Sequence, residues 1–269
     1  MNATDNHGKL AVVTGGSAGI GLELSRLLAA DGYDLIVTGT SGRVHDAASD
    51  LRGRGISVSA VQSDLSSPNG VQAVISAVQD AGRAPDMLVL NAGIAIGGAF
   101  LDVPLDQHLQ LLSLNITSTV RLCHALLPGM VAQGGGRVLF VSSLSATTPT
   151  PFESVYGPSK AFMTSFGHGL REELRGTNVQ ITILHPGATA TEFHSRAGMG
   201  ETAFGDNAWK NDPIEVAKQG YAAMKTGVTS LIGGDEDTQA AGREHKRLSE
   251  EEKARRHAEM ARPGTRKTV

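Results

Sequence analysis

Cysteine is nearly absent from this sequence, because Cys123 is the only one among 269 residues. A single thiol cannot form an internal disulfide, so the fold has no covalent cross-link of this kind within the chain. The chain also lacks an apolar run of about 18 residues, the length that a helix needs to cross a bilayer. Its first residues lack the charged and apolar regions of a signal peptide, and these absences together favour a cytoplasmic protein.

An excess of one charge is absent too, since the formal net charge is only −3. The chain therefore gives no electrostatic reason to expect nucleic acid or an anionic membrane as a partner. Nine histidines are present, but none has a ligand spacing with cysteine or paired carboxylates, so we expect no metal site. With 40% hydrophobic residues and 33 glycines, the chain can bury one large core.

Short apolar runs alternate with longer segments of helical periodicity along the chain. This alternation is typical of a parallel sheet with helices on both faces. We therefore predict an α/β fold, a Rossmann-like doubly wound parallel sheet in a single three-layer α/β/α domain. The predicted strands cover residues 9–14, 34–38, 57–61, 87–90, 138–141, 179–184 and 228–232.

The domain limits follow from composition and from helix signals. Residues 1–8 are expected to be a flexible tail, 9–235 the dinucleotide-binding catalytic domain, and 236–269 a charged, partly helical and solvated extension. In the extension, Ser249 and Glu252 match a capping box.

Two further helix starts are marked by a capping residue before a proline. These pairs are Ser67 with Pro68 and Asp212 with Pro213. Proline fits the first helical position because its missing N–H would have no partner there.

A glycine-rich turn, Thr14-Gly-Gly-Ser-Ala-Gly-Ile-Gly21, follows the first predicted strand and precedes an amphipathic helix. Gly15, Gly19 and Gly21 allow positive φ angles, close approach of backbone amides to a pyrophosphate, and tight packing of helix on strand. Glycines in a loop usually serve only to form a turn. Here the order of strand, turn and helix favours a phosphate site at the N-terminus of the helix.

Tyr156 and Lys160 are spaced by four residues, so in a helix they share one face. A tyrosine hydroxyl, with an ordinary pKa of about 10, becomes a useful acid or base only when a cation such as Lys160 stabilises its phenolate. Ser143 adds a hydroxyl that can hold a substrate oxygen. A surface tyrosine and lysine on an amphipathic helix would give the same short pattern, so the motif needs the other signals beside it.

Together these motifs resemble those of the short-chain dehydrogenase/reductase family, in its short form, over residues 9–232. Six signatures stand in family order, which chance does not readily give. They are Thr14 to Gly21, Asp64-Leu65, Asn91-Ala-Gly93, Ser143, Tyr156 with Lys160, and Pro186-Gly187 with Thr189 and Thr191.

The resemblance implies roles for individual residues. Asn91 would help hold the central strands and the cofactor backbone, Thr191 would reach the nicotinamide amide or a phosphate, and Lys160 would also bond the nicotinamide ribose. Asn115 would bend a long helix over residues 104–130 and hold a water that links Lys160 to solvent, unless it is an asparagine on a polar helix face. The expected catalytic residues are Ser143, Tyr156, Lys160 and Asn115; the expected cofactor contacts are Thr14, Gly15, Ser17, Ala18, Gly19, Ile20, Gly21, Thr40, Ser41, Arg43, Asp64 and Leu65 beside the adenine, Asn91, Ala92, Gly93, Tyr156, Lys160, Pro186, Gly187, Thr189 and Thr191.

The implied activity is an NAD(P)(H)-dependent oxidoreductase that interconverts a carbonyl and an alcohol. Tyr156 would give its proton to the carbonyl oxygen while Ser143 holds that oxygen and the nicotinamide supplies hydride. Two other functions stay open. A non-catalytic dinucleotide-binding regulator would need neither hydroxyl, and an epimerase or dehydratase of the wider family usually has a larger C-terminal substrate domain.

Cofactor choice depends on the end of the second predicted strand. NAD-preferring enzymes of this fold commonly place Asp or Glu there to accept the ribose hydroxyls, and none is present. Thr40, Ser41 and Arg43 instead offer donors to a 2′-phosphate. We therefore expect NADP(H), with NAD(H) as the alternative, although the glycine turn carries Ala18 where many NADP-binding relatives have a basic residue.

Residues 188–210 are expected to form a substrate lid. This segment holds four large apolar side chains, Phe193, Met199, Phe204 and Trp209. They favour a flap that closes over a small apolar carbonyl or alcohol, although they could simply anchor the loop to the core. The charged C-terminal extension differs from the apolar tail of tetrameric relatives, so we expect a homodimer through helices near residues 105–130 and 156–175.

Overall fold

The structure is a computed structural model that describes residues 6–52 and 55–266. Residues 1–5 of the expected N-terminal tail lie outside this described part. Asn6, within the same expected tail, is buried, and its side-chain amide donates a 3.0 Å hydrogen bond to the carbonyl of Asp31. The chain is therefore anchored to the domain from Asn6 onward.

Seven parallel strands form one sheet in the order β3-β2-β1-β4-β5-β6-β7. In register, Val12 of β1 lies opposite Ile36 of β2 and Leu88 of β4. The predicted fold class is confirmed, and each predicted strand is present with ends that differ from the prediction by at most two residues. The strands are β1 Leu10–Val13, β2 Asp34–Gly39, β3 Val58–Gln62, β4 Met87–Leu90, β5 Gly136–Val141, β6 Val179–Pro186 and β7 Ser230–Gly233.

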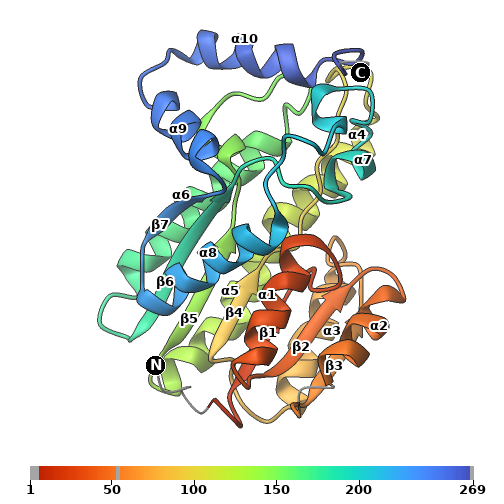
Figure 1. Cartoon of the computed structure of the whole chain (residues 1–269). Helices are drawn as coiled ribbons and strands as arrows, with labels where there is room; N and C mark the ends of the chain where they lie inside the picture. Colours follow the sequence, from red (N-terminus) through yellow and green to blue (C-terminus); the bar gives the residue numbers. More distant parts are fainter. Residues whose placement is uncertain (1–5, 53–54, 267–269) are drawn as a thin grey trace.

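Helices cover both faces of the sheet, which gives the three layers seen in Figure 1. One apolar core forms where the first group of helices packs on the sheet, and a second core forms under the other group. The first group is α1 Gly19–Ala30, α2 Arg43–Arg52 and α8 Pro213–Thr226; the second is α3 Pro68–Asp80, α5 Ser118–Ala132 and α6 Tyr156–Glu173.

The predicted helix starts are confirmed by their capping bonds. The side chains of Ser67, Asp212 and Ser249 accept hydrogen bonds from the amides of the first helical turn, at 3.0, 2.8 and 3.2 Å. The side chain of Glu252 does not accept the backbone amide of Ser249, because it pairs with Arg255 and Arg256. The capping box at Ser249 is therefore only half formed.

The long helix predicted over residues 104–130 has a change of winding in its middle. It consists of α4 Leu105–Leu112, a π-helical turn Ser113–Thr117, and α5. Asn115 lies in the π-helical turn and is fully buried. Single π-helical turns occur frequently at functional sites, because they redirect side chains without ending the helix.

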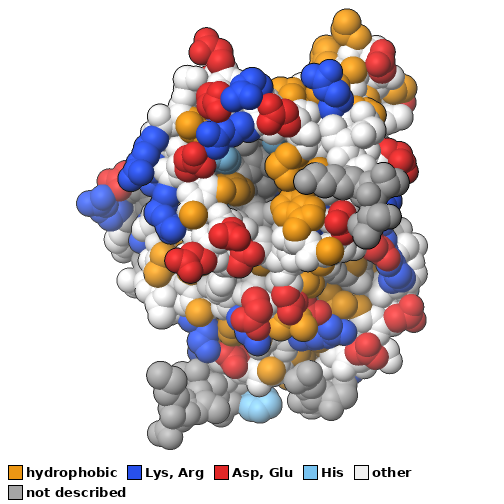
Figure 2. Space-filling view, turned by 45° about the horizontal axis from the view of Figure 1, so that its top comes forward, with side chains coloured by type: hydrophobic (Ala, Val, Ile, Leu, Met, Phe, Trp, Pro, Cys, Tyr) orange, Lys and Arg blue, Asp and Glu red, His pale blue; other side chains and the backbone are white. Residues whose placement is uncertain are grey.

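The C-terminal extension forms α9 Glu236–His245 and α10 Glu250–Ala261, which lie beyond the upper ends of the strands in Figure 1. With that end turned forward, Figure 2 shows charged side chains over the upper part of the face and apolar ones towards its centre. The expectation of a solvated helix is wrong for one side of α10, because Lys253 and Ala261 are buried.

Three polar contacts tie this extension to the segment that follows β5. Nδ1 of His245 lies 2.7 Å from Oγ1 of Thr147, and Nζ of Lys253 donates to the Thr147 carbonyl at 3.2 Å. Nε2 of His257 lies 3.1 Å from Oε2 of Glu153. Within residues 6–52 and 55–266, no helix is long and apolar enough to cross a membrane.

Lys253→Met should loosen α10 locally. The Thr147 carbonyl would lose its buried donor, a loss that costs about 1–3 kcal/mol. Hydrogen exchange of amides in α10 should therefore accelerate while exchange in the central strands stays slow. Lys246→Met, at an exposed lysine in the turn between α9 and α10, is the matched control, and equal exchange in the two variants would contradict the importance of this contact.

Candidate active site

The main cavity of the described chain lies at the carboxyl edge of the sheet and has a volume of about 1330 Å³. This edge is where open parallel sheets bind ligands. Loops that follow several strands form its walls. Eighteen of the predicted site residues line it: Gly15, Ser17, Ala18, Gly19, Ile20, Thr40, Arg43, Leu65, Asn91, Ala92, Gly93, Ser143, Tyr156, Lys160, Pro186, Gly187, Thr189 and Thr191.

The glycine turn has the geometry of an anion cradle. Gly15 and Gly19 have φ angles of 65° and 52°, values that favour glycine. A Cβ atom on Gly21 would lie 2.2 Å from the carbonyl oxygen of Gly15, so only glycine lets the helix approach this closely. The first turn of α1 has no capping side chain and no acidic residue. Its amides are therefore available to a pyrophosphate, and the turn fits a dinucleotide.

Asn91 and Ala92 join the end of β4 to the glycine turn through four hydrogen bonds, three of them made by Asn91. Its side-chain amide donates to the carbonyls of Thr14 and Gly15 at 2.9 and 3.2 Å. In return, Oγ1 of Thr14 accepts the amides of Asn91 and Ala92 at 2.9 and 3.0 Å. Thr14 thus supports the cradle from behind and does not itself line the cavity.

Four other predicted residues also do not line the cavity. Gly21 packs beneath the turn, and Ser41 and Asp64 are exposed residues. Oδ1 of Asp64 accepts the amide of Ser66 at 2.9 Å, so this carboxylate closes a turn before α3. Asn115 is enclosed behind the cavity wall.

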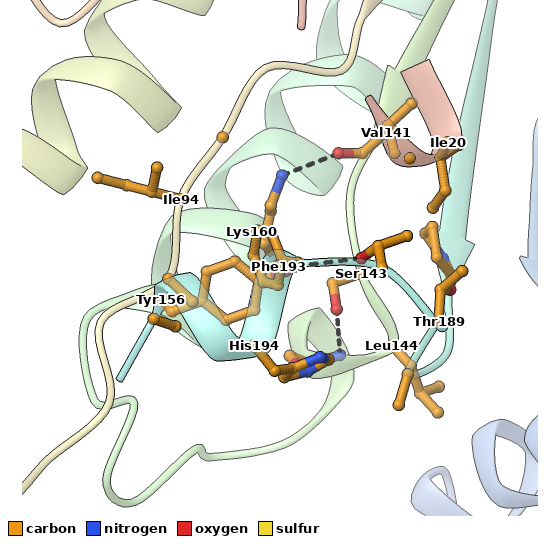
Figure 3. Close-up of a pocket in the computed structure, with 18 of the residues that line it drawn as sticks. Ile20, Ile94, Val141, Ser143, Leu144, Tyr156, Lys160, Thr189, Phe193 and His194 are labelled. Carbon is orange, nitrogen blue, oxygen red and sulfur yellow. Dashed lines mark hydrogen bonds between the residues drawn. The ribbon is translucent and has the colours of Figure 1, made fainter. Parts of the chain in front are cut away.

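Ser143, Tyr156 and Lys160 come together as the motif predicts, and Figure 3 shows them facing one space with Phe193 and His194 beside them. Nζ of Lys160 lies 5.9 Å from the centre of the Tyr156 ring and donates to the Val141 carbonyl at 2.9 Å. Oγ of Ser143 accepts the amide of Ser145 at 3.1 Å, which holds the hydroxyl at the end of β5.

Burial dominates the ionisation of this group. Burial raises the pKa of Tyr156 above its ordinary value of 10, a hydrogen bond with Ser143 acts to lower it, and the negative charge of Glu153 raises it further. Burial also lowers the pKa of Lys160 to about 8. The net shift of Tyr156 is therefore opposite to the one expected from Lys160, because a low-dielectric site disfavours both charged forms.

Asn115 links three parts of the site from its position in the π-helical turn. Its side-chain oxygen accepts the Ile94 amide at 3.0 Å, and its side-chain nitrogen donates to the Ile94 carbonyl and to Oγ of Ser159, each at 2.9 Å. A Cβ atom on Gly93 would lie 3.1 Å from Oδ1 of Asn115 and 3.2 Å from Nζ of Lys160. Asn115 is thus a buried tie between β4 and α6, and not an asparagine on a polar helix face.

The residues expected to bind a 2′-phosphate lie at the other end of the cavity. Thr40 and Arg43 line it there, between the end of β2 and the start of α2. The Arg43 guanidinium is engaged by an acid from a distant segment, since its Nη1 lies 3.0 Å from Oε2 of Glu192. No local sequence motif predicts this pairing.

The four apolar lid residues have different positions. Phe193, in the short helix α7 Phe193–Arg196, lies with its ring centre 5.5 Å from that of Tyr156. Phe204, in the 3₁₀ turn Ala203–Gly205, and Trp209 also line the cavity, with ring centres 5.8 Å apart. Met199 is buried in a small core with Ala95 and Tyr156, so it anchors the loop.

Sequence reasoning missed Glu153, His194 and His257, which all line the cavity. His194 stacks on Phe204 at 5.1 Å, and His257 packs on the same ring at 5.7 Å. Oε1 of Glu153 and Nδ1 of His194 are buried atoms without a hydrogen-bond partner. Burial, with nearby positive charge, lowers the pKa of His194 to about 3, so its ring is neutral.

These three residues could not have been found from local motifs. Glu153 and His257 are 104 residues apart in the sequence, and only the docking of α10 brings them together. Among the described residues, no group of three or more His, Cys, Asp or Glu side chains is placed to hold a metal ion.

Comparisons with known proteins agree with this geometry. The short chain dehydrogenase family model matches residues 9–201. Sulfoacetaldehyde reductase 2 of Chromohalobacter salexigens is 33% identical over 205 residues, which are 75% of this chain and 81% of that protein. The structure of a short-chain dehydrogenase from Sphingobium yanoikuyae in complex with NADPH has a TM-score of 0.78 at 28% identity, covering 83% of this chain and 87% of that one.

A 7beta-hydroxysteroid dehydrogenase structure has a TM-score of 0.84 at 22% identity, and the match covers 96% of this chain and all of the other, 100%. At this identity the likeness concerns the fold alone. The family match covers most of the domain, and the glycine turn, the buried tyrosine and the lysine lie together at one cavity. The chain therefore belongs to the short-chain dehydrogenase family, whose members are oxidoreductases that use a nicotinamide dinucleotide.

Proposed function

We propose that this enzyme is an NADPH-dependent reductase of apolar ketones or aldehydes, with Tyr156 as its general acid. The observation that carries the proposal is the meeting of Ser143, Tyr156 and Lys160 at the cavity that the glycine turn also lines. The bound nicotinamide would supply hydride to the carbonyl carbon. The protein would position the carbonyl and deliver the proton.

The proton step belongs to Tyr156. Burial holds its pKa above the ordinary value of 10, so the phenol keeps its proton at neutral pH. A protonated phenol can donate to a carbonyl oxygen, which suits reduction more than oxidation. Ser143 would hold the same oxygen. Lys160, with a pKa of about 8, would carry its charge at neutral pH and steady the phenolate left by proton transfer.

NADPH as the cofactor is supported by charge at the adenosine end of the cavity. No acidic residue lies between the end of β2 and the start of α2, whereas Thr40 and Arg43 line the cavity there. A guanidinium can form charge-assisted hydrogen bonds with a phosphate dianion. One structural relative was solved with NADPH.

Two features of the cavity wall support an apolar substrate. They are its aromatic side chains and the ion pairs that its cationic side chains form with carboxylates. Phe193, Phe204 and Trp209 supply aromatic surface near Tyr156. Each cationic side chain of the wall, Lys160 apart, has a carboxylate beside it, so an anionic substrate would meet the repulsion of that carboxylate as well as the attraction of the cation. These pairs are Arg43 and Arg196 with Glu192, Arg256 with Glu244 and Glu252, and Lys253 with Glu250.

Tyr156→Phe should lower turnover at least about 10²-fold, the lower end of general-acid contributions, and leave NADPH affinity nearly unchanged. Initial-rate assays that follow NADPH absorbance at 340 nm measure turnover, and a binding titration measures NADPH affinity. Tyr221→Phe is the control, because it also removes the hydroxyl of a buried tyrosine. That hydroxyl donates to Asp31, far from the site. Near wild-type turnover in Tyr156→Phe would remove the tyrosine from the mechanism and favour another proton donor.

Substrate preference should follow the apolar wall. An alicyclic or aromatic ketone should have a higher kcat/KM than an analogue of equal size that carries a carboxylate, because no unpaired guanidinium awaits that charge. Phe193→Ala should lower kcat/KM for the apolar ketone by roughly 10-fold or more, as expected for a lost aromatic contact. A wild-type preference for the carboxylate analogue would contradict the proposed substrate class.

Arg43→Ala should weaken NADPH binding by about 1.5 kcal/mol, the lower end for hydrogen bonds to charged groups, because Arg43 must give up Glu192 to bind phosphate. NADH binding should stay nearly unchanged. Fluorescence titration of both cofactors tests this, with Arg175→Ala, an exposed arginine at the end of α6, as control. An equal loss for NADH, or tighter binding of NADH by the wild type, would refute the cofactor assignment.

A further inference from the structure

The acid missing from the end of β2 is supplied by a distant part of the chain. Glu192 lies just before α7, 149 residues after Arg43 in the sequence, and both its oxygens face Nη1 of Arg43, at 3.0 and 3.3 Å. Both residues line the cavity. The structure thus places a carboxylate at the adenosine end of the cavity, although residues 39–45 at the end of β2 include none.

Glu192 has a second cationic partner. Nη2 of Arg196, one turn further along α7, also contacts Oε2 of Glu192. The carboxylate therefore lies between two arginines, one on the cofactor side and one on the lid. The neighbouring Thr191 is close to the glycine turn, since a Cβ on Gly19 would lie 3.1 Å from its Cγ2.

These contacts are exposed, so their exchange costs little. The side chains of Arg43 and Glu192 have relative accessibilities of 45% and 58%, and that of Arg196 has 57%. Exposed ion pairs contribute little stability because water screens them and long side chains lose freedom. A doubly charged phosphate is a stronger partner for a guanidinium than one such carboxylate. A carboxylate that stayed beside the phosphate would repel it.

We propose that Glu192 is a cofactor-discriminating residue that competes with the 2′-phosphate of NADPH for Arg43 and keeps Arg196 when the phosphate is bound. This inference rests on the proposed use of Arg43 for NADPH. NADH has no 2′-phosphate and leaves the Arg43–Glu192 pair intact. Glu192 therefore reduces the preference for NADPH that Arg43 alone would give.

The test is a set of Kd measurements for NADPH and NADH by fluorescence titration at low salt. Glu192→Gln removes the competing charge and should tighten NADPH binding about 2- to 5-fold, the range of an exposed ion pair, with NADH unchanged. Arg196→Gln leaves Glu192 with Arg43 as its partner and should weaken NADPH binding by a similar factor. Both effects should shrink at high salt, because exposed charges are screened.

The double variant Arg43→Ala with Glu192→Gln shows whether Glu192 acts through Arg43. In that background the change at Glu192 should no longer alter NADPH affinity. The control is Glu172→Gln. This change removes an exposed carboxylate of α6 that pairs with Arg175. Unchanged NADPH affinity in Glu192→Gln, an equal change for NADH, or a gain that persists without Arg43 would overturn the inference.

The two proposals fail in different ways. If Arg43→Ala binds NADPH as tightly as the wild type, the assignment of Arg43 fails, and the inference about Glu192 fails with it. If Arg43→Ala weakens NADPH binding while Glu192→Gln leaves it unchanged, only the inference about Glu192 is wrong.

Discussion

The parallel pairing of β4 with β1 and β5 determines where each group of the site lies. Because the three strands run in one direction, the segments after them leave the sheet at the same edge. Asn91 then bonds the glycine turn to the end of β4, and Lys160 bonds the Val141 carbonyl at the end of β5. A shift of one strand by one residue would separate the cofactor cradle from the catalytic group and turn each side chain of that strand to the opposite face of the sheet.

Much of this arrangement could be predicted from the sequence because its causes are local. β-branched runs mark the strands, and Ser67, Asp212 and Ser249 mark helix starts that the capping bonds confirm. The spacing of Tyr156 and Lys160 predicted a shared helix face, and both line the cavity. The place of Asp64 beside the adenine stays a prediction, and its motif gives no sign that its carboxylate also closes a turn with Ser66.

Other features could not be predicted because they depend on the environment of a charge or on distant contacts. The pKa of Tyr156 rises since burial and the charge of Glu153 outweigh the hydrogen bond with Ser143. The composition of the extension suggested full solvation, yet Lys253 and His257 reach inward to Thr147 and Glu153. Charge counts describe a helix as a whole, whereas the buried side of α10 depends on a few positions.

The position of Trp209 has a spectroscopic consequence. It is the only tryptophan in the chain, and it lies in the segment 188–210 that is expected to be the substrate lid, with Nε1 donating to the Ala203 carbonyl at 3.1 Å and its side chain partly open to solvent. Indole emission shifts with the polarity around the ring, and here no second indole overlaps it. The protein therefore carries an intrinsic fluorophore that reports on the surroundings of residues 188–210 in the unlabelled enzyme.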